Sequence, residues 1–199
     1  IVKGMVESGN AIALMGNHEY NALCFHFQET EGGHLRKHLI KNIIQHYETL
    51  KQFQNRQDEY EMYLDWFKTL PLYYETETFR AVHACWDYDN IEFLRKTLEN
   101  DRLTDDLIYE SVKKGTRLYE AIDETLKGKE LAMPNGLSFT DKDGTTRNEI
   151  RIKWWENPAI QTFQSISVIP IESLPEEPIP VAMTSDSYYL EDDKPVFFG

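Results

Sequence analysis

The sequence has few cysteines, few basic residues for its number of acidic ones, and no long apolar run. Its two cysteines, Cys24 and Cys85, cannot form a disulfide framework, so we expect free buried thiols in a reducing compartment. No stretch approaches the roughly 18 apolar residues that span a bilayer, and no signal peptide is visible. These features favour a cytoplasmic protein without a membrane partner.

Acidic residues outnumber basic ones by 34 to 21, which gives a formal net charge of −13 at pH 7. Binding of duplex nucleic acid depends on clustered Lys and Arg that displace counterions, so we do not expect this class of partner. A chain of 199 residues with 41% hydrophobic content can bury one sizeable core. We therefore expect a single domain over residues 1–199.

The pattern of apolar residues predicts an α/β fold with an unusually helical middle. Short strands are expected at 11–15, 72–74, 78–82 and near 196, with the first, third and last in one central sheet. Helices are expected over 19–27, 35–53 and 58–70, from Asp89 or Asn90 to Leu98, and after the caps Thr104 and Thr116 as far as Gly128. The helices at 31–70 and 90–126 are expected to cover the sheet or to cap the site described below.

The last third of the chain has fewer helical signals. Alternating apolar residues on both sides of Asp141-Lys142-Asp143-Gly144 predict a hairpin over about 137–154. Residues 169–180 hold four prolines among acidic residues, which predicts a surface loop.

The chain is organised around the stretch 11–19. Ala11-Ile12-Ala13-Leu14-Met15 is an unbroken apolar run, too short for a helix core and typical of a buried strand. Gly16 permits a tight turn that a side chain would obstruct. Asn17 and His18 then stand where the strand gives way to a helix. In open α/β sheets ligands bind beyond the carboxyl ends of strands, and a helix N-terminus there favours a phosphate.

Two stretches carry a resemblance to a known family. Gly16-Asn17-His18-Glu19 after a buried strand resembles the third signature block of the calcineurin-like metallophosphoesterases, in the branch of the Ser/Thr protein phosphatases and the diadenosine tetraphosphatases. Phe79-Arg80-Ala81-Val82-His83-Ala84, a second predicted strand ending in histidine, is similar to the block that supplies a metal ligand in that family. The order of the two blocks also agrees.

The resemblance implies a calcineurin-like β-sandwich core, to which this chain would add a large helical insertion or cap at about 31–70 and further helices at about 89–127. It implies a metal-dependent phosphatase that hydrolyses a phosphate ester or phosphoanhydride with two divalent ions (manganese, iron or zinc) and a metal-bound hydroxide. In the family, Asn17 and His83 would bind the second metal and His18 would be the general acid.

The same roles follow from the residue types. The side-chain oxygen of Asn17 is a hard neutral donor, and His83 offers a neutral imidazole nitrogen. His18 directly follows Asn17, which favours hydrogen bonding to the phosphate and protonation of the leaving group over sharing the metal. Glu19 is expected to be structural or to support these residues from outside the site.

Two earlier family blocks, Gly-Asp-x-His-Gly and Gly-Asp-x-x-Asp-Arg-Gly, do not occur in the sequence. They would supply the ligands of the first metal, the bridging Asp and a phosphate-binding Arg. The strand-like run Pro195–Gly199 stops where the family continues with a Gly-His block. We therefore expect an internal piece of a longer phosphoesterase, inactive by itself and able to hold at most one partial metal site.

Each assigned role has a simpler alternative. Asn17 can be a turn residue, His18 a residue at a helix start, and His83 a satisfied buried histidine at a strand end. Arg147 and Arg151 are candidates for binding a substrate phosphate as bidentate forks. A surface hairpin with alternating charges accounts for these two arginines equally well.

Other clusters are weaker candidates. His34 and His38 have a spacing that can bind zinc, but the adjacent Arg36-Lys37 opposes a metal, so a solvated helix face is favoured. The pair Trp154-Trp155 is predicted to lie at the core and its rim rather than to stack on a nucleobase. Glu191-Asp192-Asp193 is predicted to be a solvated loop rather than a cation site.

Two functions remain open at this point. The first is a hydrolase whose substrate is a phosphorylated small molecule, a nucleotide or a phosphoprotein. The second is a non-catalytic binding module that keeps the phosphoesterase scaffold without a full metal set. Gly-Asp blocks upstream and a Gly-His block after Gly199 would favour the enzyme.

Overall fold

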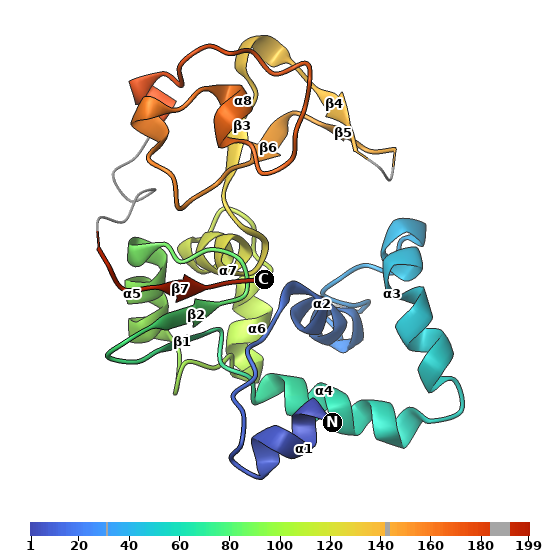
Figure 1. Ribbon diagram of the computed structural model, residues 1–199. Coiled ribbons are helices and arrows are strands. Elements are labelled where there is room, and N and C mark those ends of the chain that lie inside the picture. Colours follow the sequence, from blue (N-terminus) through green and yellow to red (C-terminus); the bar gives the residue numbers. More distant parts are fainter. Residues whose placement is uncertain (31, 142–143, 184–191) are drawn as a thin grey trace.

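The structure is a computed structural model that describes residues 1–30, 32–141, 144–183 and 192–199. It combines helices with small sheets, as expected for an α/β chain (Figure 1). The helices are α1 (Val2–Glu7), α2 (Asn17–His26), α3 (Ile40–Phe53), α4 (Gln57–Lys68), α5 (Tyr88–Thr97), α6 (Asp105–Ser111), α7 (Arg117–Lys127) and α8 (Phe163–Ile166). The strands are β1 (Tyr73–Glu75), β2 (Arg80–Val82), β3 (Glu130–Ala132), β4 (Phe139–Thr140), β5 (Thr146–Arg147), β6 (Glu149–Arg151) and β7 (Val196–Phe197).

The largest sheet joins distant parts of the chain. Its order is β1-β2-β7, with β1 antiparallel to β2 and β7 parallel to β2. In the parallel pair, Arg80 lies opposite Val196 and Ala81 opposite Phe197. The prediction that the strands near 80 and 196 share one sheet is therefore confirmed.

The predicted strand at residues 11–15 is wrong. The segment is extended and leads to the fully buried Met15, but Met15 N–H donates to the carbonyl of Pro71 (2.9 Å) without forming a ladder in the described residues. A strand requires that successive backbone groups pair with a neighbour, and apolar character alone does not supply that partner. The prediction of burial holds only for Met15, since Ile12 is 55% exposed and Ala11, Ala13 and Leu14 are half-buried.

Most predicted helices are present, and their caps explain the boundaries. Thr104 and Thr116 accept hydrogen bonds from the first turns of α6 and α7, and Gly128 ends α7 with φ +90°, as predicted. The predicted cap of α5 is wrong by two or three residues. Asp87 caps this helix by accepting from Asn90 N–H (2.9 Å), and Asn90 itself is buried.

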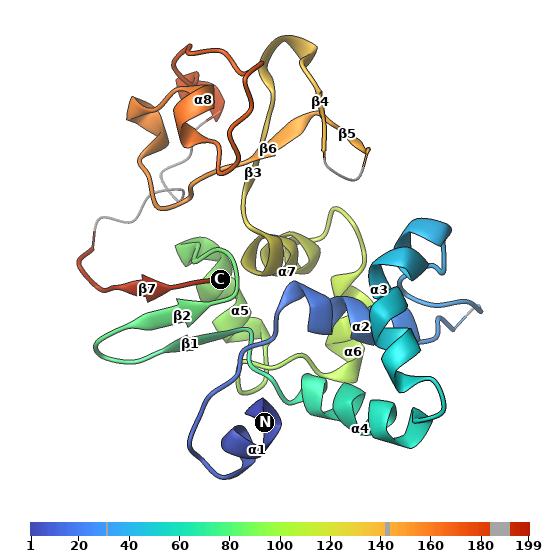
Figure 2. The same cartoon turned by 45° about the vertical axis from the view of Figure 1, so that its right-hand side comes forward.

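Helix α3 differs from the prediction in its start and in its packing. It begins at Ile40 rather than near 35, because the N–H groups of Leu35 and Arg36 donate to carbonyls at the end of α2. No residue of α3 is buried, and Ile40 is 78% exposed. Figures 1 and 2 show α2 between the large sheet and α3. Helix α3 therefore does not cover the sheet.

The buried apolar residues form two clusters. The larger lies among β1, β2 and helices α2 and α5–α7 and includes Trp86, Leu94 and Ile122. The smaller joins β3, β6 and α8 and includes Ile150 and Phe163. Figures 1 and 2 show this second part above α7.

Two predictions for the region after α7, the hairpin over 137–154 and the surface loop at 169–180, are only partly right. Strands β4 and β5 form the expected antiparallel hairpin, whose central turn residues Lys142 and Asp143 lie outside the described residues. Strand β6 pairs with β3 instead of continuing that hairpin. The proline-rich stretch 169–180 is more than a surface loop, because Leu174 and Ile179 are buried in the smaller cluster.

A buried polar network fixes the loop after β2 to α7 and β3. Lys129 Nζ lies 2.6 Å from Asp87 Oδ2, and both side chains are at most 5% exposed. The Asn90 amide donates to Glu124 (2.6 Å) and accepts from Arg117. Burial raises the pKa of Glu124, and the nearby Lys129 acts in the opposite direction.

Replacing Lys129 by Met should reduce the free energy of unfolding by about 3–5 kcal/mol, because the Asp87 carboxylate would remain buried without its cation. Urea unfolding of the purified chain measures this change. Lys113→Met is the matched control: Lys113 pairs with Glu110 at the surface, where such a pair contributes less than about 1 kcal/mol. Equal losses in the two variants would contradict the structural importance of the buried pair.

Candidate functional site

The candidate site lies where β2 and β7 end and α2 begins. Strand β2 is followed by His83, and the parallel strand β7 is followed by Phe198 and Gly199. The two strand ends are joined by a hydrogen bond from Gly199 N–H to the His83 carbonyl (3.0 Å). The edge beyond the carboxyl ends of parallel strands is where α/β folds bind ligands.

His83 reaches this edge beside Gly16, the residue before α2. A Cβ atom at Gly16 would lie 3.1 Å from both Nδ1 and Cε1 of His83 and 2.7 Å from Glu19 Oε2. The backbone of Gly16 is extended (φ −99°, ψ 175°), a conformation open to any residue. The need for glycine therefore comes from the close approach of two side chains, and the expected tight turn is not its cause.

Glu19 has the structural role expected from the sequence. Its Oε2 accepts a hydrogen bond from Gly16 N–H (3.0 Å), which caps the N-terminus of α2. Burial lowers the pKa of His83, the nearby carboxylate of Glu19 opposes that shift, and His18 reinforces it. The imidazole of His83 is thus favoured in its neutral form, in which a ring nitrogen can accept a proton or a metal ion.

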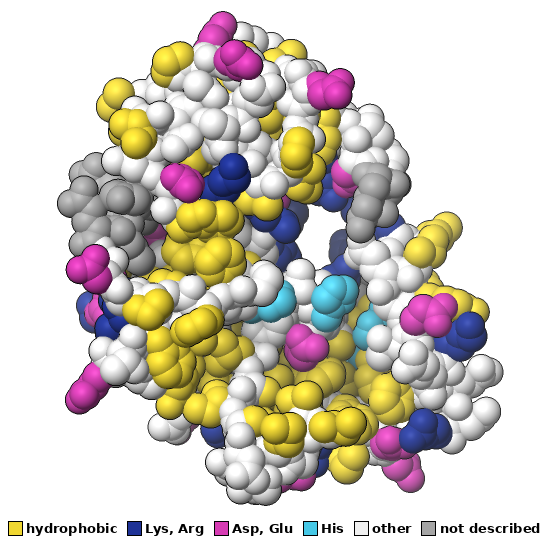
Figure 3. All heavy atoms as spheres, in the orientation of Figure 1, with side chains coloured by type: hydrophobic (Ala, Val, Ile, Leu, Met, Phe, Trp, Pro, Cys, Tyr) yellow, Lys and Arg dark blue, Asp and Glu magenta, His cyan; other side chains and the backbone are white. Residues whose placement is uncertain are grey.

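Asn17 and His18 face a cavity of about 290 Å³ between α2 and α3. Asn17 is half-buried and His18 is exposed. The cavity is also lined by Asn21, Phe25, Arg36, Asn42, Gln45 and His46. In the space-filling view, histidine side chains gather at the middle of the molecule, beside the hollow between its lower and upper parts (Figure 3).

A cluster of histidine and aromatic rings holds α3 beside α2. The Tyr60 hydroxyl lies 3.1 Å from His26 Nε2 and 2.6 Å from His46 Nε2. Phe25 stacks on His38 with ring centroids 3.9 Å apart. Burial lowers the pKa of His46 to about 4, and the nearby His26 and Arg36 act in the same direction. His46 is therefore neutral at pH 7 and fills the wall of the cavity as an uncharged ring.

The prediction that His34 and His38 lie on a helix is wrong, although His38 is exposed as expected and His34 is half-buried. Both residues precede α3, and their rings stack with centroids 3.9 Å apart. His38 Nε2 lies 2.8 Å from the Phe25 carbonyl.

The two arginines proposed for substrate binding lie on the strands after α7. Arg147 is exposed on β5 and pairs with Asp141 (2.9 Å), and Arg151 is exposed on β6 and lies 3.6 Å from Glu130. The cavity that Asn17 and His18 line includes neither of them. These contacts agree with the simpler alternative, a surface with alternating charges.

The other weak candidates take structural roles. Trp154 is buried and donates its indole N–H to the Ala84 carbonyl (2.8 Å), and Trp155 is 40% exposed, as expected for core and rim. Asp192 is more than part of a solvated loop, because it pairs with the buried Arg80 (2.7 Å), which holds the Asp192 pKa well below its usual range. Glu191 lies outside the described residues.

Several side chains of the cavity were not identified from the sequence. Arg36 was considered only as an obstacle to a metal, and Asn42, Gln45 and His46 were assigned to an amphipathic helix. Their shared location depends on how α3 docks on α2, which is set by Tyr60 and Phe25. No spacing within residues 36–46 signals that contact.

Within the described ranges, no group of three or more His, Cys, Asp or Glu side chains is arranged to hold a metal ion. Both cysteines are free and buried, and none of the described helices has the length and apolar character needed to cross a membrane. Protein-family models, curated proteins and solved structures give no match to this chain.

Replacing Gly16 by Ala should lower the free energy of unfolding by about 1–3 kcal/mol, because the new methyl group would displace His83 or Glu19. The imidazole resonances of His83 should shift in the same variant. Gly4→Ala in α1 is the control, since nothing lies within 4 Å of its new Cβ and alanine favours a helix by about 0.5–1 kcal/mol. An unchanged His83 spectrum in the Gly16 variant would show that the ring does not lie against this backbone.

Proposed function

We propose that this chain is part of a metal-dependent phosphoesterase of the calcineurin-like type, with a β-sandwich core in the complete protein. The observation that carries the proposal is the position of the His83 ring. It lies against Gly16, the residue that precedes Asn17 and His18 in the chain, at the edge where β2 and β7 end. These are the two sequence blocks on which the family resemblance rests, and they are 65 positions apart in the chain.

The N-terminus of α2 suits a phosphate. A helix N-terminus carries about half a positive elementary charge and N–H groups directed away from the helix. His18 is the second residue of this ten-residue helix and is exposed to the cavity. An imidazole at this place can donate a hydrogen bond to a phosphate oxygen and pass its proton to the departing alkoxide or phosphate.

Asn17 and His83 are the residues that would hold a divalent ion. An amide oxygen and a neutral imidazole fit manganese, iron or zinc, and neither donor adds negative charge next to an anionic substrate. When bound, a pair of such ions neutralises phosphate charge and activates a water molecule for attack. Two donors make only part of one metal site, so the remaining ligands would come from sequence outside this chain.

Replacing His18 by Asn in the full-length protein should reduce hydrolysis of an aryl phosphate in the presence of manganese by at least about 100-fold, the usual contribution of a general acid. His83→Asn should also lower the affinity for manganese. His34→Asn is the control, because its ring stacks on His38 outside the cavity. If activity survives in the variant lacking both His18 and His83, the assigned roles are wrong.

The second candidate is a non-catalytic module that binds a phosphorylated ligand. It is favoured by the lack of any metal-binding group of three or more His, Cys, Asp or Glu in the described parts of the chain. For the enzyme, elemental analysis of the isolated chain should find at most one weakly bound divalent ion, because Asn17 and His83 make only part of one metal site. Full-length protein that binds phosphate but turns over no phosphate ester with manganese would favour the module.

A further inference from the structure

Among the described residues that line the cavity between α2 and α3, none is acidic, although the protein as a whole is acidic. Acidic residues outnumber basic ones by 34 to 21 in the whole sequence. The described residues that line the cavity are three asparagines, one glutamine, two histidines, one phenylalanine and Arg36. The cavity therefore offers hydrogen-bond donors and one permanent positive charge, which is a composition suited to an anion.

Arg36 is held in this wall by neutral groups. Its Nη2 atom donates to Gln45 Oε1 (2.5 Å) and to Asn42 Oδ1 (3.3 Å). Across the described residues, no carboxylate forms an ion pair with this guanidinium, and burial lowers its pKa. A partly desolvated guanidinium without an acidic partner gains free energy when an anion binds to its remaining N–H groups.

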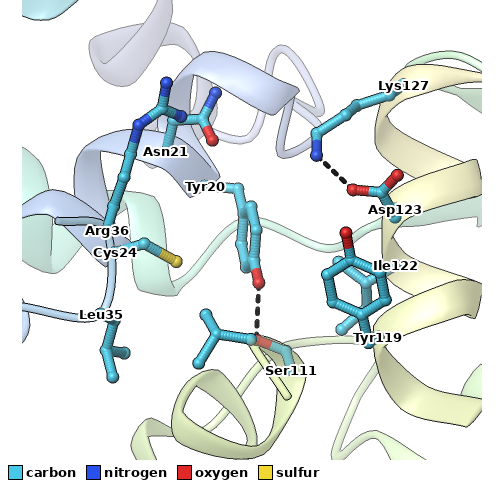
Figure 4. Close-up of a pocket in the computed structure, with 11 residues that line it drawn as sticks. Tyr20, Asn21, Cys24, Leu35, Arg36, Ser111, Tyr119, Ile122, Asp123 and Lys127 are labelled. Carbon is cyan, nitrogen blue, oxygen red and sulfur yellow. Dashed lines mark hydrogen bonds and ion pairs between the residues drawn. The ribbon is translucent and has the colours of Figure 1, made fainter. Parts of the chain in front are cut away.

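Figure 4 shows the other side of the same arginine, from the neighbouring cavity that contains Tyr20 and Cys24. Arg36 extends beside Asn21, and both residues line the two cavities. The carboxylate of this second cavity, Asp123, lies across from Arg36 and is paired with Lys127. It is therefore already neutralised by another cation.

The α2–α3 cavity offers hydrogen-bond donors to an anion at two positions. One is at Asn17 and His18, at the N-terminus of α2, and the other is at Arg36, with Asn42 and Gln45 beside it. We propose that Arg36 binds a second phosphoryl group of the substrate, next to the scissile phosphate at Asn17 and His18. The identity of the scissile group rests on the proposed function.

Two positions for anions in one cavity favour a substrate with two phosphoryl groups. A phosphoanhydride or a bisphosphorylated compound places two anionic groups in the cavity, whereas a phosphomonoester with a neutral leaving group uses only one. A guanidinium binds phosphoryl oxygens through two parallel hydrogen bonds, so the second group adds both affinity and orientation. The protein should prefer substrates of the first kind.

The test compares the affinities of the full-length protein for inorganic pyrophosphate and inorganic phosphate, measured by NMR titration of the histidine resonances without metal. In the unmodified protein pyrophosphate should bind at least about tenfold more tightly than phosphate, as expected for one added charge-assisted contact. Arg36→Gln should bring this ratio close to one. Arg147→Gln, which removes an exposed arginine paired with Asp141, should leave the ratio unchanged.

A second measurement covers the case in which Arg36→Gln disturbs the packing of α3. In the unmodified protein, pyrophosphate should protect Arg36 from an arginine-specific dicarbonyl reagent and should leave Arg147 reactive, as read by mass spectrometry of the peptides. Equal ratios in the two variants, no preference for pyrophosphate in the unmodified protein, or unprotected Arg36 would each overturn the inference. None of these readouts requires hydrolysis, so the inference and the proposed function can fail separately.

Discussion

The parallel pairing of β2 with β7 is the constraint on which the candidate site depends. Two residues of each strand are in register, and the hydrogen bond from Gly199 to the His83 carbonyl continues the contact beyond the strands. Because the strands run in the same direction, both deliver their following residues to one edge of the sheet. Helix α2 starts at that edge, with Gly16 leaving just enough room for the His83 ring.

Two contacts hold the loop that follows β2 and carries His83. Trp154, far along the chain, donates its indole N–H to the carbonyl of Ala84, the residue after His83. The buried pair of Asp87 and Lys129 fixes the same loop to the start of β3. The loop that carries His83 is thus restrained by a hydrogen bond and an ion pair of low solvent exposure, which limits its conformations.

The sequence was sufficient where local patterns decide the structure. Thr104, Thr116 and Gly128 predicted helix ends correctly, since caps act on their own helix. The sequence was insufficient where contacts with a distant segment of the chain decide the structure. The run at 11–15 has the composition of a strand, but no described segment forms a ladder with it. Residues 35–39 have helical spacing, but the N–H groups of Leu35 and Arg36 donate to carbonyls at the end of α2. For the site, the sequence pattern predicted His18 and His83. It did not predict Arg36, which joins the cavity only because residues 35–36 pack beside α2.

The way α3 is attached has a consequence for the stability of individual regions. This helix buries none of its residues and is held to its neighbours largely by polar and stacking contacts around Tyr60, Phe25 and Phe53. Local opening of a segment costs less free energy when little apolar area is exposed by it. The amides of α3 should therefore exchange with solvent deuterium through detachment of this helix alone, well before the sheet and α7 unfold together.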